Sequence, residues 1–397
     1  MSVVIDWLKN KTLTFFRKGD MILLILCLTT SAFSTLIMAS VTNAEKFGHS
    51  SRYIYIHIGA AIIGLIAYAV MSSIDAEFFQ EHRVALVCIN VFLLLLLIPF
   101  GTDANTGNKS WIDIPFLPFN IQPAEICRIF YILIMASVMY AHQSHLSSVR
   151  SMVHMVAHLA IIAGLNYLLS SDLGVTMIFV FVFVGMTFSG GVRWYWYAAG
   201  GGVLAVVGPT IWNLFMSDEQ RNRIAYVFMP DVIDPTGLDE GWHTTQSLKS
   251  LTGGGLTGQG LFNGNRTQAG NLFAQHTDFI FSSIGEELGF LGCLLILVML
   301  GAIIARCVWV GCRTHDTMRR MICFGAATSL LFQVILNVGM CMGVLPVIGL
   351  TLPLISYGGS SVVTTYAMLG LVSGVYARPE KRSHERYIRQ PIKTDLY

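Results

Sequence analysis

Charged side chains occur at four places in or beside long apolar stretches of this sequence. A charge at the centre of a membrane helix costs about 2.5–3.5 kcal/mol on insertion scales, so such residues usually bind a ligand or take part in chemistry. The sharpest place is His276-Thr277-Asp278, just before an apolar run that begins at Ile280. A carboxylate there could act as a general base, although Asp278 also suits the N-cap of the following helix.

Two further carboxylates, Glu286 and Glu287, lie inside that apolar run. Adjacent helical residues point about 100° apart, so we expect only one of the two to face the same groove as Asp278. Three glycines at i, i+4 and i+7 predict a small-residue face that another helix can approach closely: Gly285, Gly289 and Gly292.

Polar residues at the outer ends of two other expected helices form the second and third places. Glu125 and Arg128 follow Pro123 at i and i+3, so both project from one helix face and can pair; ordinary helix capping with a charge pair is the alternative. Asp172 stands where a helix N-cap belongs. Trp111 either contacts a ligand or anchors the chain at the membrane interface.

The fourth place is a run of cations in the segment 216–277: Arg221, Arg223, Lys249 and Arg266. These cations suit an anionic ligand. Pairing with six acidic residues of the same segment is the alternative: Asp218, Glu219, Asp231, Asp234, Asp239 and Glu240.

The composition predicts a polytopic membrane protein. Of the 397 residues, 54% are hydrophobic and only 12% are charged, whereas soluble domains carry about 25% charged residues. The mean hydropathy is +0.62. A net charge of +2 argues against nucleic-acid binding. The eight cysteines lie in or beside apolar segments, with no CxxC pair and no cluster of histidines in the sequence, so neither a disulfide framework nor a zinc site is predicted.

About ten stretches are long enough to cross the roughly 30 Å hydrocarbon core as helices, which predicts an all-α fold. They span Met21–Val41, Tyr53–Met71, Val84–Phe100, Ala124–Tyr140, Met152–Leu169, Leu173–Phe188, Trp194–Phe215, Ile280–Val310, Met321–Val344 and Pro353–Tyr376. We expect a membrane domain over 21–377 with tails at 1–20 and 378–397. The segment 216–277, between spans 7 and 8, is expected to be ordered against the outer face. The Gly/Pro-rich run Gly343–Ser360 could enter the membrane only where its backbone is satisfied.

The basic residues predict that both termini are cytoplasmic. With that orientation, 17 of the 25 basic residues lie inside: Lys9, Lys11, Arg17, Lys18, Arg83, Arg150, Arg193, Arg306, Arg313, Arg319, Arg320, Arg378, Lys381, Arg382, Arg386, Arg389 and Lys393.

These motifs together resemble the SEDS family (shape, elongation, division and sporulation), whose members include RodA, FtsW and SpoVE. The likeness runs from Lys18-Gly-Asp20 to the end of the tenth span. It is carried by Trp111, Gln122-Pro-Ala-Glu125, Asp172-Leu-Gly174, Gln220-Arg-Asn-Arg223, Gly241-Trp-His243, Gln246-Ser247, His276-Thr-Asp-Phe-Ile-Phe281, Gly285-Glu-Glu-Leu-Gly289, Asn337-Val-Gly339 and Pro353-Leu-Ile-Ser-Tyr-Gly-Gly-Ser-Ser361. The short tails lean toward RodA, while the last motif is typical of division members.

The resemblance implies a peptidoglycan glycosyltransferase that polymerises lipid II on the outer face of the bacterial cytoplasmic membrane. Asp278 matches the family's essential aspartate. Glu125, Arg128 and Asp172 match polar positions of its central cavity, with Arg128 where many relatives have lysine. Ser170-Ser171 replaces the Gln-Pro of many relatives, which leaves the local turn open. The implied partners are a class B penicillin-binding transpeptidase and other elongation or division membrane proteins.

In the expected reaction, Asp278 is the general base. The candidate residues for binding the substrate are Glu125, Arg128, Asp172, Trp111, Arg221, Arg223, Lys249, His276 and Gln246. A divalent cation, Mg²⁺ or Mn²⁺, is a further candidate for stabilising the leaving diphosphate. A lipid-linked oligosaccharide flippase is the rival hypothesis, but it needs polar residues on a path that reaches both faces. A noncatalytic morphogenesis scaffold is the third, and it predicts that Asp278 is dispensable.

Overall fold

The computed structural model describes residues 19–48, 51–102, 109–115, 117 and 119–378, nearly all of them helical or in connecting turns. In chain order the elements are α2 (Met21–Val41), the short helix η1 (Glu45–Phe47), α3 (Arg52–Ser73), α4 (Ala76–Glu81), α5 (Arg83–Leu95), α6 (Leu97–Phe100), β1 (Gly101–Thr102), β2 (Trp111–Ile112), α7 (Pro123–Ala141), α8 (Val149–Ser170), α9 (Leu173–Ser189), α10 (Trp194–Thr210), the π-helical turn η2 (Ile211–Phe215), α11 (Asp218–Phe228), α12 (Pro230–Ile233), α13 (Trp242–Gly254), α14 (Asn265–Gln268), α15 (Ile280–Arg313), α16 (Thr317–Cys341) and α17 (Gly359–Ala377).

The expected all-α membrane fold is confirmed. Within the described residues, nine helical spans are long and apolar enough to cross a membrane, and the 17-residue α9 lies among them as a shorter tenth. The last predicted span began too early, because α17 starts only at Gly359. Residues 344–358 form no helix, since Pro353, Gly349 with φ 66° and Leu354 with φ 61° are incompatible with one.

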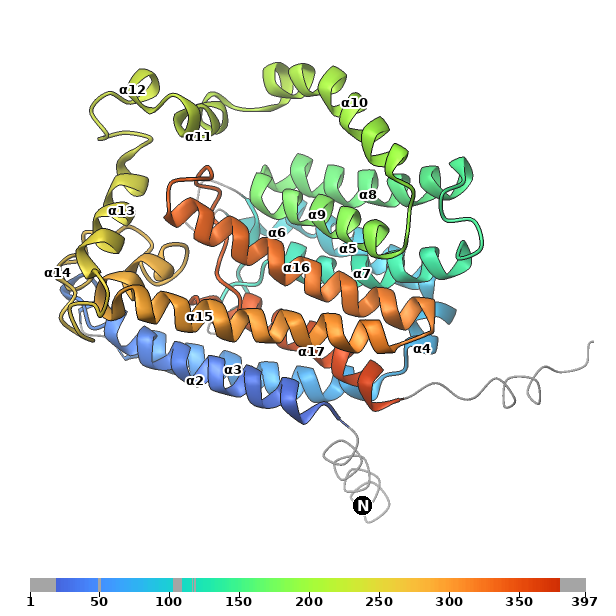
Figure 1. Cartoon of the computed structure of the whole chain (residues 1–397), viewed down its shortest axis with the longest axis horizontal. Helices are drawn as coiled ribbons and strands as arrows, with labels where there is room; N and C mark the ends of the chain where they lie inside the picture. The colour runs from blue at the N-terminus through green and yellow to red at the C-terminus, as the bar shows by residue number, and fades with distance from the viewer. Residues whose placement is uncertain (1–18, 49–50, 103–108, 116, 118, 379–397) are drawn as a thin grey trace, which may run out of the picture.

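The centre of the bundle is built from α7, α16 and α17, which are the most buried spans. Helix α17 packs closely on α3, because a Cβ atom at Gly370 would lie 2.5 Å from the carbonyl oxygen of Tyr68. In Figure 1 the long helices run side by side along the long axis of the molecule. The start of α2 lies beside α17, where the Asp20 amide donates to Ser373 Oγ at 3.1 Å. The chain therefore enters and leaves the membrane domain at the same end, as an even number of spans requires.

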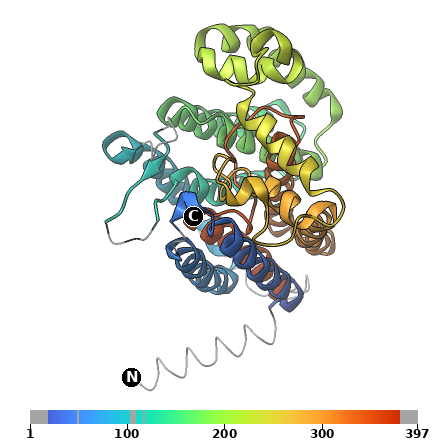
Figure 2. The same cartoon turned by 90° about the vertical axis from the view of Figure 1, so that its left-hand side faces the viewer.

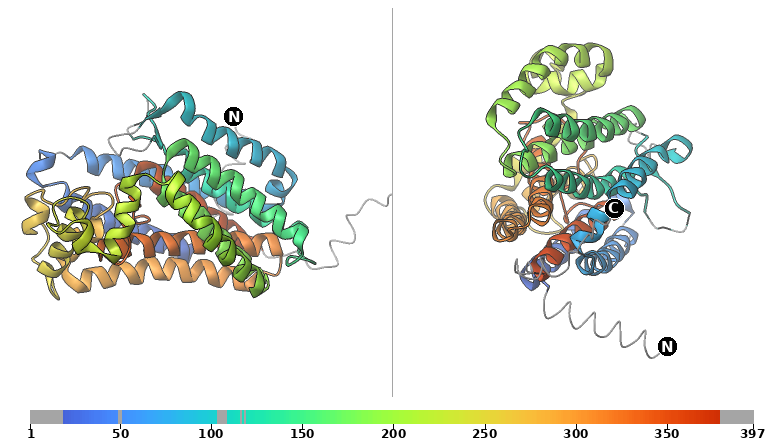
Figure 3. Two further views of the ribbon diagram at one scale, coloured as in Figure 1. Left: turned by 90° about the horizontal axis from the view of Figure 1, so that it is seen from above. Right: turned by 90° about the vertical axis from the view of Figure 1, so that its right-hand side faces the viewer.

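Helix α10 is set apart from this bundle (Figures 1 and 2). None of its residues is buried, and a Cβ atom built at Gly200, Gly201 or Gly202 meets no other atom within 4 Å. The view from above shows α10 running obliquely to the other spans (Figure 3, left). From its far end, α11 and α12 lead to α13 and α14, which cover one end of the bundle.

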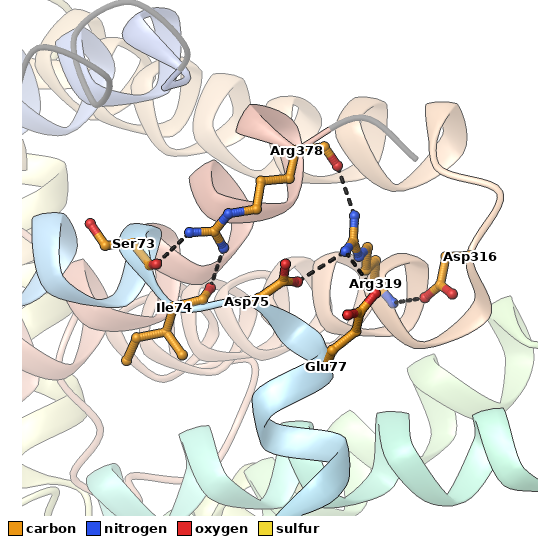
Figure 4. Close-up of polar contacts among 7 residues, drawn as sticks. All are labelled: Ser73, Ile74, Asp75, Glu77, Asp316, Arg319 and Arg378. Atoms are coloured by element: carbon orange, nitrogen blue, oxygen red, sulfur yellow. Dashed lines mark hydrogen bonds and ion pairs between the residues drawn. The ribbon is translucent and has the colours of Figure 1, made fainter. Parts of the chain in front are cut away.

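A cluster of polar contacts ties three segments together at the opposite end (Figure 4). The Arg378 guanidinium, after α17, donates to the last carbonyls of α3: to Ile74 O at 2.6 Å and to Ser73 O. Arg319, at the start of α16, donates to Asp75 Oδ1 at 2.9 Å and to the carbonyl of Arg378 at 2.8 Å. These bonds satisfy helix-end carbonyls that would otherwise be unpaired.

We expect Arg319→Met to lower the free energy of unfolding by about 2 kcal/mol, the usual worth of hydrogen bonds to a charged group. Thermal unfolding in detergent should show a lower Tm. The matched control is Arg313→Met at the same end, whose guanidinium only stacks on Trp309, 4.2 Å from the ring centre. Equal Tm values for both variants would contradict a structural role of the Arg319 contacts.

Candidate functional site

The backbone of Asp278 is fixed by α16 and by the irregular segment 344–358. Asn337 Nδ2 donates to the Asp278 carbonyl at 2.8 Å and also to the Leu350 carbonyl. The carboxylate lies against Gly349, where a Cβ atom would be 3.5 Å from Asp278 Oδ2. A Cβ atom at Gly349 would make an ordinary contact with the carboxylate, so it is the positive φ at this position that favours glycine.

The residues just before Asp278 are held by the same segment. Ser356 Oγ donates to the Thr277 carbonyl at 2.6 Å, and the Tyr357 amide donates to the His276 carbonyl at 2.8 Å. The Gly/Pro-rich run thus holds the loop that carries Asp278, and its backbone irregularity is satisfied within the protein.

The Asp278 carboxylate is only partly exposed. Desolvation is the main reason that its pKa is raised to about 6; a hydrogen bond from Thr277 counteracts part of this effect, and the neighbouring Asp172 carboxylate adds to it. Burial likewise raises the pKa of Asp172. A carboxylate that titrates near neutral pH can both accept and release a proton, which suits a general base.

A chain of hydrogen bonds links the predicted carboxylates Asp172 and Glu125. Asp172 Oδ1 caps α9 by accepting from the Val175 amide at 3.0 Å, so the N-cap interpretation is confirmed. Its other oxygen accepts from Gln122 Nε2 at 3.1 Å. The Gln122 amide approaches Ser360 Oγ at 3.4 Å, and this hydroxyl donates to Glu125 Oε2 at 2.9 Å. The starts of α7, α9 and α17 are therefore joined around one polar cluster.

Arg128 is buried one turn deeper on α7. Its NH1 group donates to Gln333 Oε1 on α16 at 2.8 Å, while its Nε and NH2 groups have no hydrogen-bond partner in the described structure. Within the described residues no ion pair joins it to Glu125, so each residue of the expected pair bonds a different helix instead. A buried guanidinium with two unpaired groups favours an anionic ligand.

A cavity of about 480 Å³ opens beside this cluster. Asp172 and Gly174 line it from α9, Arg223 lines it from α11, and Pro346 and Ile348 line it from the segment that braces Asp278. Gly174 lies against this segment, since a Cβ atom there would be 2.6 Å from the Ile348 carbonyl. Asp278 does not line the cavity, but its carboxylate lies against Gly349, next to the lining residue Ile348, and interacts with Asp172. The cavity together with Asp278 is the candidate functional site.

Three of the predicted cations have different surroundings. Arg221 pairs with Asp218, as the pairing alternative predicted, and it does not line the cavity. Arg223 pairs with Glu219 yet lines the cavity. Lys249 is exposed on α13.

Three other predicted ligands contact neighbouring protein groups. Gln246 accepts a hydrogen bond from Arg266. The His276 ring lies in an aromatic cluster, 5.0 Å from Phe47 and 5.5 Å from Tyr357, and burial lowers its pKa to about 4. Trp111 pairs with Thr102 in a two-stranded hairpin.

The two adjacent glutamates both hold the segment between α13 and α15. Glu286 accepts from the backbone amides of Arg266 and Thr267, each at 2.9 Å. Glu287 accepts from Ser40 of α2 at 2.5 Å and from Gln268 at 2.8 Å. Neither glutamate is seen to share the groove of Asp278, because both carboxylates bind groups of other elements.

The predicted glycine face of α15 is only partly right. Gly285 allows a close approach of α13, since a Cβ atom at Gly285 would lie 2.4 Å from Leu251 Cδ2. Gly289, however, has φ 65° and ψ −164°, so it breaks the helix and is not part of a regular face. This kink lets residues 256–258 pack against the α15 backbone.

The described residues contain no group of three His, Cys, Asp or Glu side chains that could hold a metal ion. The carboxylates of Asp278, Asp172 and Glu125 are bonded separately to protein groups. This donor set does not fit a protein-built metal site, so no chemical step is assigned to a metal.

Sequence reasoning missed Gln333, which binds Arg128, and did not assign a role to Asn337, which binds Asp278. The sequence pattern that could have revealed both residues is a polar stripe on an apolar helix, with Ser329, Gln333 and Asn337 at i, i+4 and i+8.

Comparison with known proteins places these features in one family. The chain is 30% identical over 365 residues to the peptidoglycan glycosyltransferase MrdB of Escherichia coli K12, covering 91% of this chain and 95% of that protein. It is 32% identical to the probable peptidoglycan glycosyltransferase FtsW of Geobacter metallireducens, covering 91% and 96%.

Two solved structures share the fold. One comes from a study of polymerization and crosslinking by a peptidoglycan synthase complex, with TM-score 0.75, 27% identity and coverage of 90% of this chain and 97% of that one. The other is a mutant of the rod shape determining protein RodA of Thermus thermophilus, with TM-score 0.66, 25% identity and the same coverage. The family model for cell cycle proteins of the FtsW, RodA and SpoVE type matches residues 19–381. The chain therefore belongs to this family of polytopic membrane proteins.

Proposed function

We propose that this chain is a peptidoglycan glycosyltransferase that polymerises lipid II, with Asp278 as the general base. The observation that carries the proposal is the setting of Asp278: its pKa is raised to about 6, and it interacts with Asp172, which lines the 480 Å³ cavity. The named activities of the relatives support the same reaction.

In the proposed reaction, Asp278 removes the proton from the 4-hydroxyl of one lipid-linked disaccharide. The oxygen attacks the anomeric carbon of a second disaccharide, and the bond from this carbon to the diphosphate breaks. The electron pair leaves with the polyprenyl diphosphate, and a direct displacement of this kind inverts the anomeric configuration. A positioned general base contributes about 10²–10⁴ in rate.

The leaving diphosphate needs positive charge close by, and Arg128 is the strongest candidate because two of its guanidinium groups lack protein partners. Arg223 is a second candidate at the cavity, although it already pairs with Glu219. Arg221 and Lys249 lie at the surface and would meet only the outer parts of a bound substrate.

The lipid tails need a lateral entrance, and the separation of α10 from the bundle supplies one. Tyr167 on α8 and Phe215, next to α10, both line the cavity, and the Tyr167 hydroxyl donates to the Phe215 carbonyl at 2.7 Å. The cavity is therefore bordered by the helices between which a polyprenyl chain would pass.

The proposed orientation puts both termini in the cytoplasm and Asp278 at the outer face of the bacterial cytoplasmic membrane. The distribution of basic residues supports it. We also propose a class B penicillin-binding transpeptidase as partner, supported by the likeness to a chain of a peptidoglycan synthase complex. The similarity to RodA and MrdB supports a role in elongation, and the comparable identity to FtsW relatives supports a role in division as the alternative.

The rival flippase hypothesis is tested in proteoliposomes that carry fluorescent lipid II in one leaflet only. A polymerase with its transpeptidase partner converts the lipid II that its outer face can reach into strands and leaves the opposite leaflet unchanged. Transfer of the label between leaflets without strand formation would support a flippase and contradict the proposal.

The pKa of Asp278 predicts the acidic limb of the pH profile. A base must be ionised to work, so activity is nearly full at pH 7 and falls as the pH drops through about 6, by about tenfold for each unit below it. Initial rates of lipid II polymerisation between pH 4.5 and 8 test this expectation. A rate that stays constant down to pH 5 would contradict the assignment of Asp278 as base.

A further inference from the structure

A second cavity, of about 440 Å³, lies at the end of the bundle opposite Asp278. It is formed by the loop between α7 and α8 and the turn between α9 and α10; the right-hand view of Figure 3 looks at this end of the molecule. Its lining is polar, with Gln143, His145, Ser148 and Arg193 among the residues. None of these residues belongs to the proposed catalytic site.

Hydrogen bonds fix the shape of this cavity. The Arg193 amide donates to Ser147 Oγ at 3.1 Å, and Trp196 Nε1 donates to the Ser147 carbonyl at 2.9 Å. Gly191, with φ 82°, makes the tight turn that brings these groups together. On the other side, Gln143 Oε1 accepts from Thr317 of α16 at 2.9 Å. Three separate elements therefore hold the cavity walls.

The charge around the cavity is positive. Arg193 lines it, and Arg150 and Arg83 interact electrostatically with the nearby His154. Among the described residues none of these three arginines forms an ion pair.

Two acidic residues lie close in sequence to the residues named at this end of the bundle. Glu81 precedes Arg83 by two positions, and Asp316 precedes Thr317 while its carboxylate caps α16. The excess of positive charge favours an anionic ligand. The positive-inside tendency explains basic residues at this end, but it does not require a cavity lined with hydroxyl, amide and imidazole groups.

The cavity lies at the depth of lipid headgroups. Arg193 is followed directly by Trp194, Tyr195, Trp196 and Tyr197, and aromatic residues of this kind gather at the membrane interface. Trp194 is 78% exposed and Tyr195 is 41% exposed, so these rings are free to contact lipid. A ligand in the cavity would have its phosphate beside Arg193 and its acyl chains along α8 and α10.

We propose that this cavity binds the phosphate headgroup of an anionic glycerophospholipid from the inner leaflet. Arg193 pairs with the phosphate, and His145 and the serine hydroxyls supply further hydrogen bonds. The inner-leaflet assignment rests on the orientation proposed above, but the binding itself depends on neither that orientation nor the glycosyl transfer chemistry.

Native mass spectrometry of the full-length protein in detergent tests the proposal. Phosphatidylglycerol and phosphatidylcholine are titrated separately into wild type, Arg193→Gln, Arg193→Lys and the matched control Arg313→Gln, an arginine of α15 at the same end. We expect wild type to prefer phosphatidylglycerol, and Arg193→Gln to bind it about fivefold more weakly, the usual effect of one basic residue near anionic lipid. Arg193→Lys and Arg313→Gln should bind it nearly as wild type does.

Equal phosphatidylglycerol binding by wild type and Arg193→Gln would overturn the proposal. An equal loss in Arg313→Gln would also overturn it, because the attraction would then be general to this surface. Inorganic phosphate at millimolar concentration serves as competitor, and we expect it to leave the lipid bound. Full displacement of the lipid by phosphate would overturn the lipid assignment in favour of a free cytoplasmic anion. Because the readout is binding, a failed polymerisation assay would leave this result unaffected.

Discussion

Asp278→Asn is expected to reduce the rate of lipid II polymerisation by about 10²–10⁴-fold, because the amide cannot accept the proton of the attacking hydroxyl. The substitution keeps the size of the side chain. The backbone contact from Asn337 uses the Asp278 carbonyl, so it is unaffected. Loss of the charge also removes repulsion with Asp172, so the Tm of the variant should match or exceed that of wild type.

Asp231→Asn is the matched control for this prediction. Asp231 is an exposed carboxylate of α12 within the same large segment, and it does not line the cavity. It should retain wild-type activity. Full activity of Asp278→Asn would remove Asp278 from the role of base, and inactivity of both variants would point to a general effect of charge at this face.

Arg128→Gln is expected to lower kcat/KM by about 10²–10³, the usual cost of removing one group that stabilises developing negative charge. Among the described residues, two groups of the buried guanidinium have no hydrogen-bond partner, and in the proposed reaction they donate to the diphosphate. Steady-state polymerisation with purified lipid II gives the comparison.

Arg128→Lys separates charge from folding in this experiment. A lysine keeps the positive charge although it cannot reproduce the planar guanidinium, so it should retain more activity than Arg128→Gln. Gln333 loses its donor in the glutamine variant, and the Tm of each variant shows how much stability depends on that bond. Activity near wild type in a stably folded Arg128→Gln would contradict the proposed role in binding the diphosphate.

Hydropathy predicted the number of spans and most of their ends, because a membrane helix must be long and apolar wherever it occurs. The segment 344–358 was harder to assign. Its apolar composition suggested that a helix began at Pro353, whereas positive φ angles at Gly349 and Leu354 and the bonds to Asn337 and Thr277 keep it irregular. Those contacts join residues far apart in the chain, and no local pattern encodes them.

The residues of the candidate site were predictable by type, since ionisable residues within or beside apolar membrane segments often mark functional sites. Their partners were not. The pairing of Arg128 with Gln333 depends on how α7 and α16 are rotated against each other, which helical spacing within one span cannot give. The same limit explains Glu286 and Glu287, whose spacing suggested a groove while their partners lie on α2 and on α14 with its flanking loop.

The most direct test of the central claim is polymerisation of labelled lipid II by the purified protein together with a cognate class B penicillin-binding protein, with strands resolved by length on a gel. The transpeptidase partner should be one that has no glycosyltransferase domain of its own. We expect glycan strands from wild type and from Asp231→Asn, and none from Asp278→Ala. Strands of equal yield from Asp278→Ala, or no strands from a folded wild type with its partner present, would contradict the account.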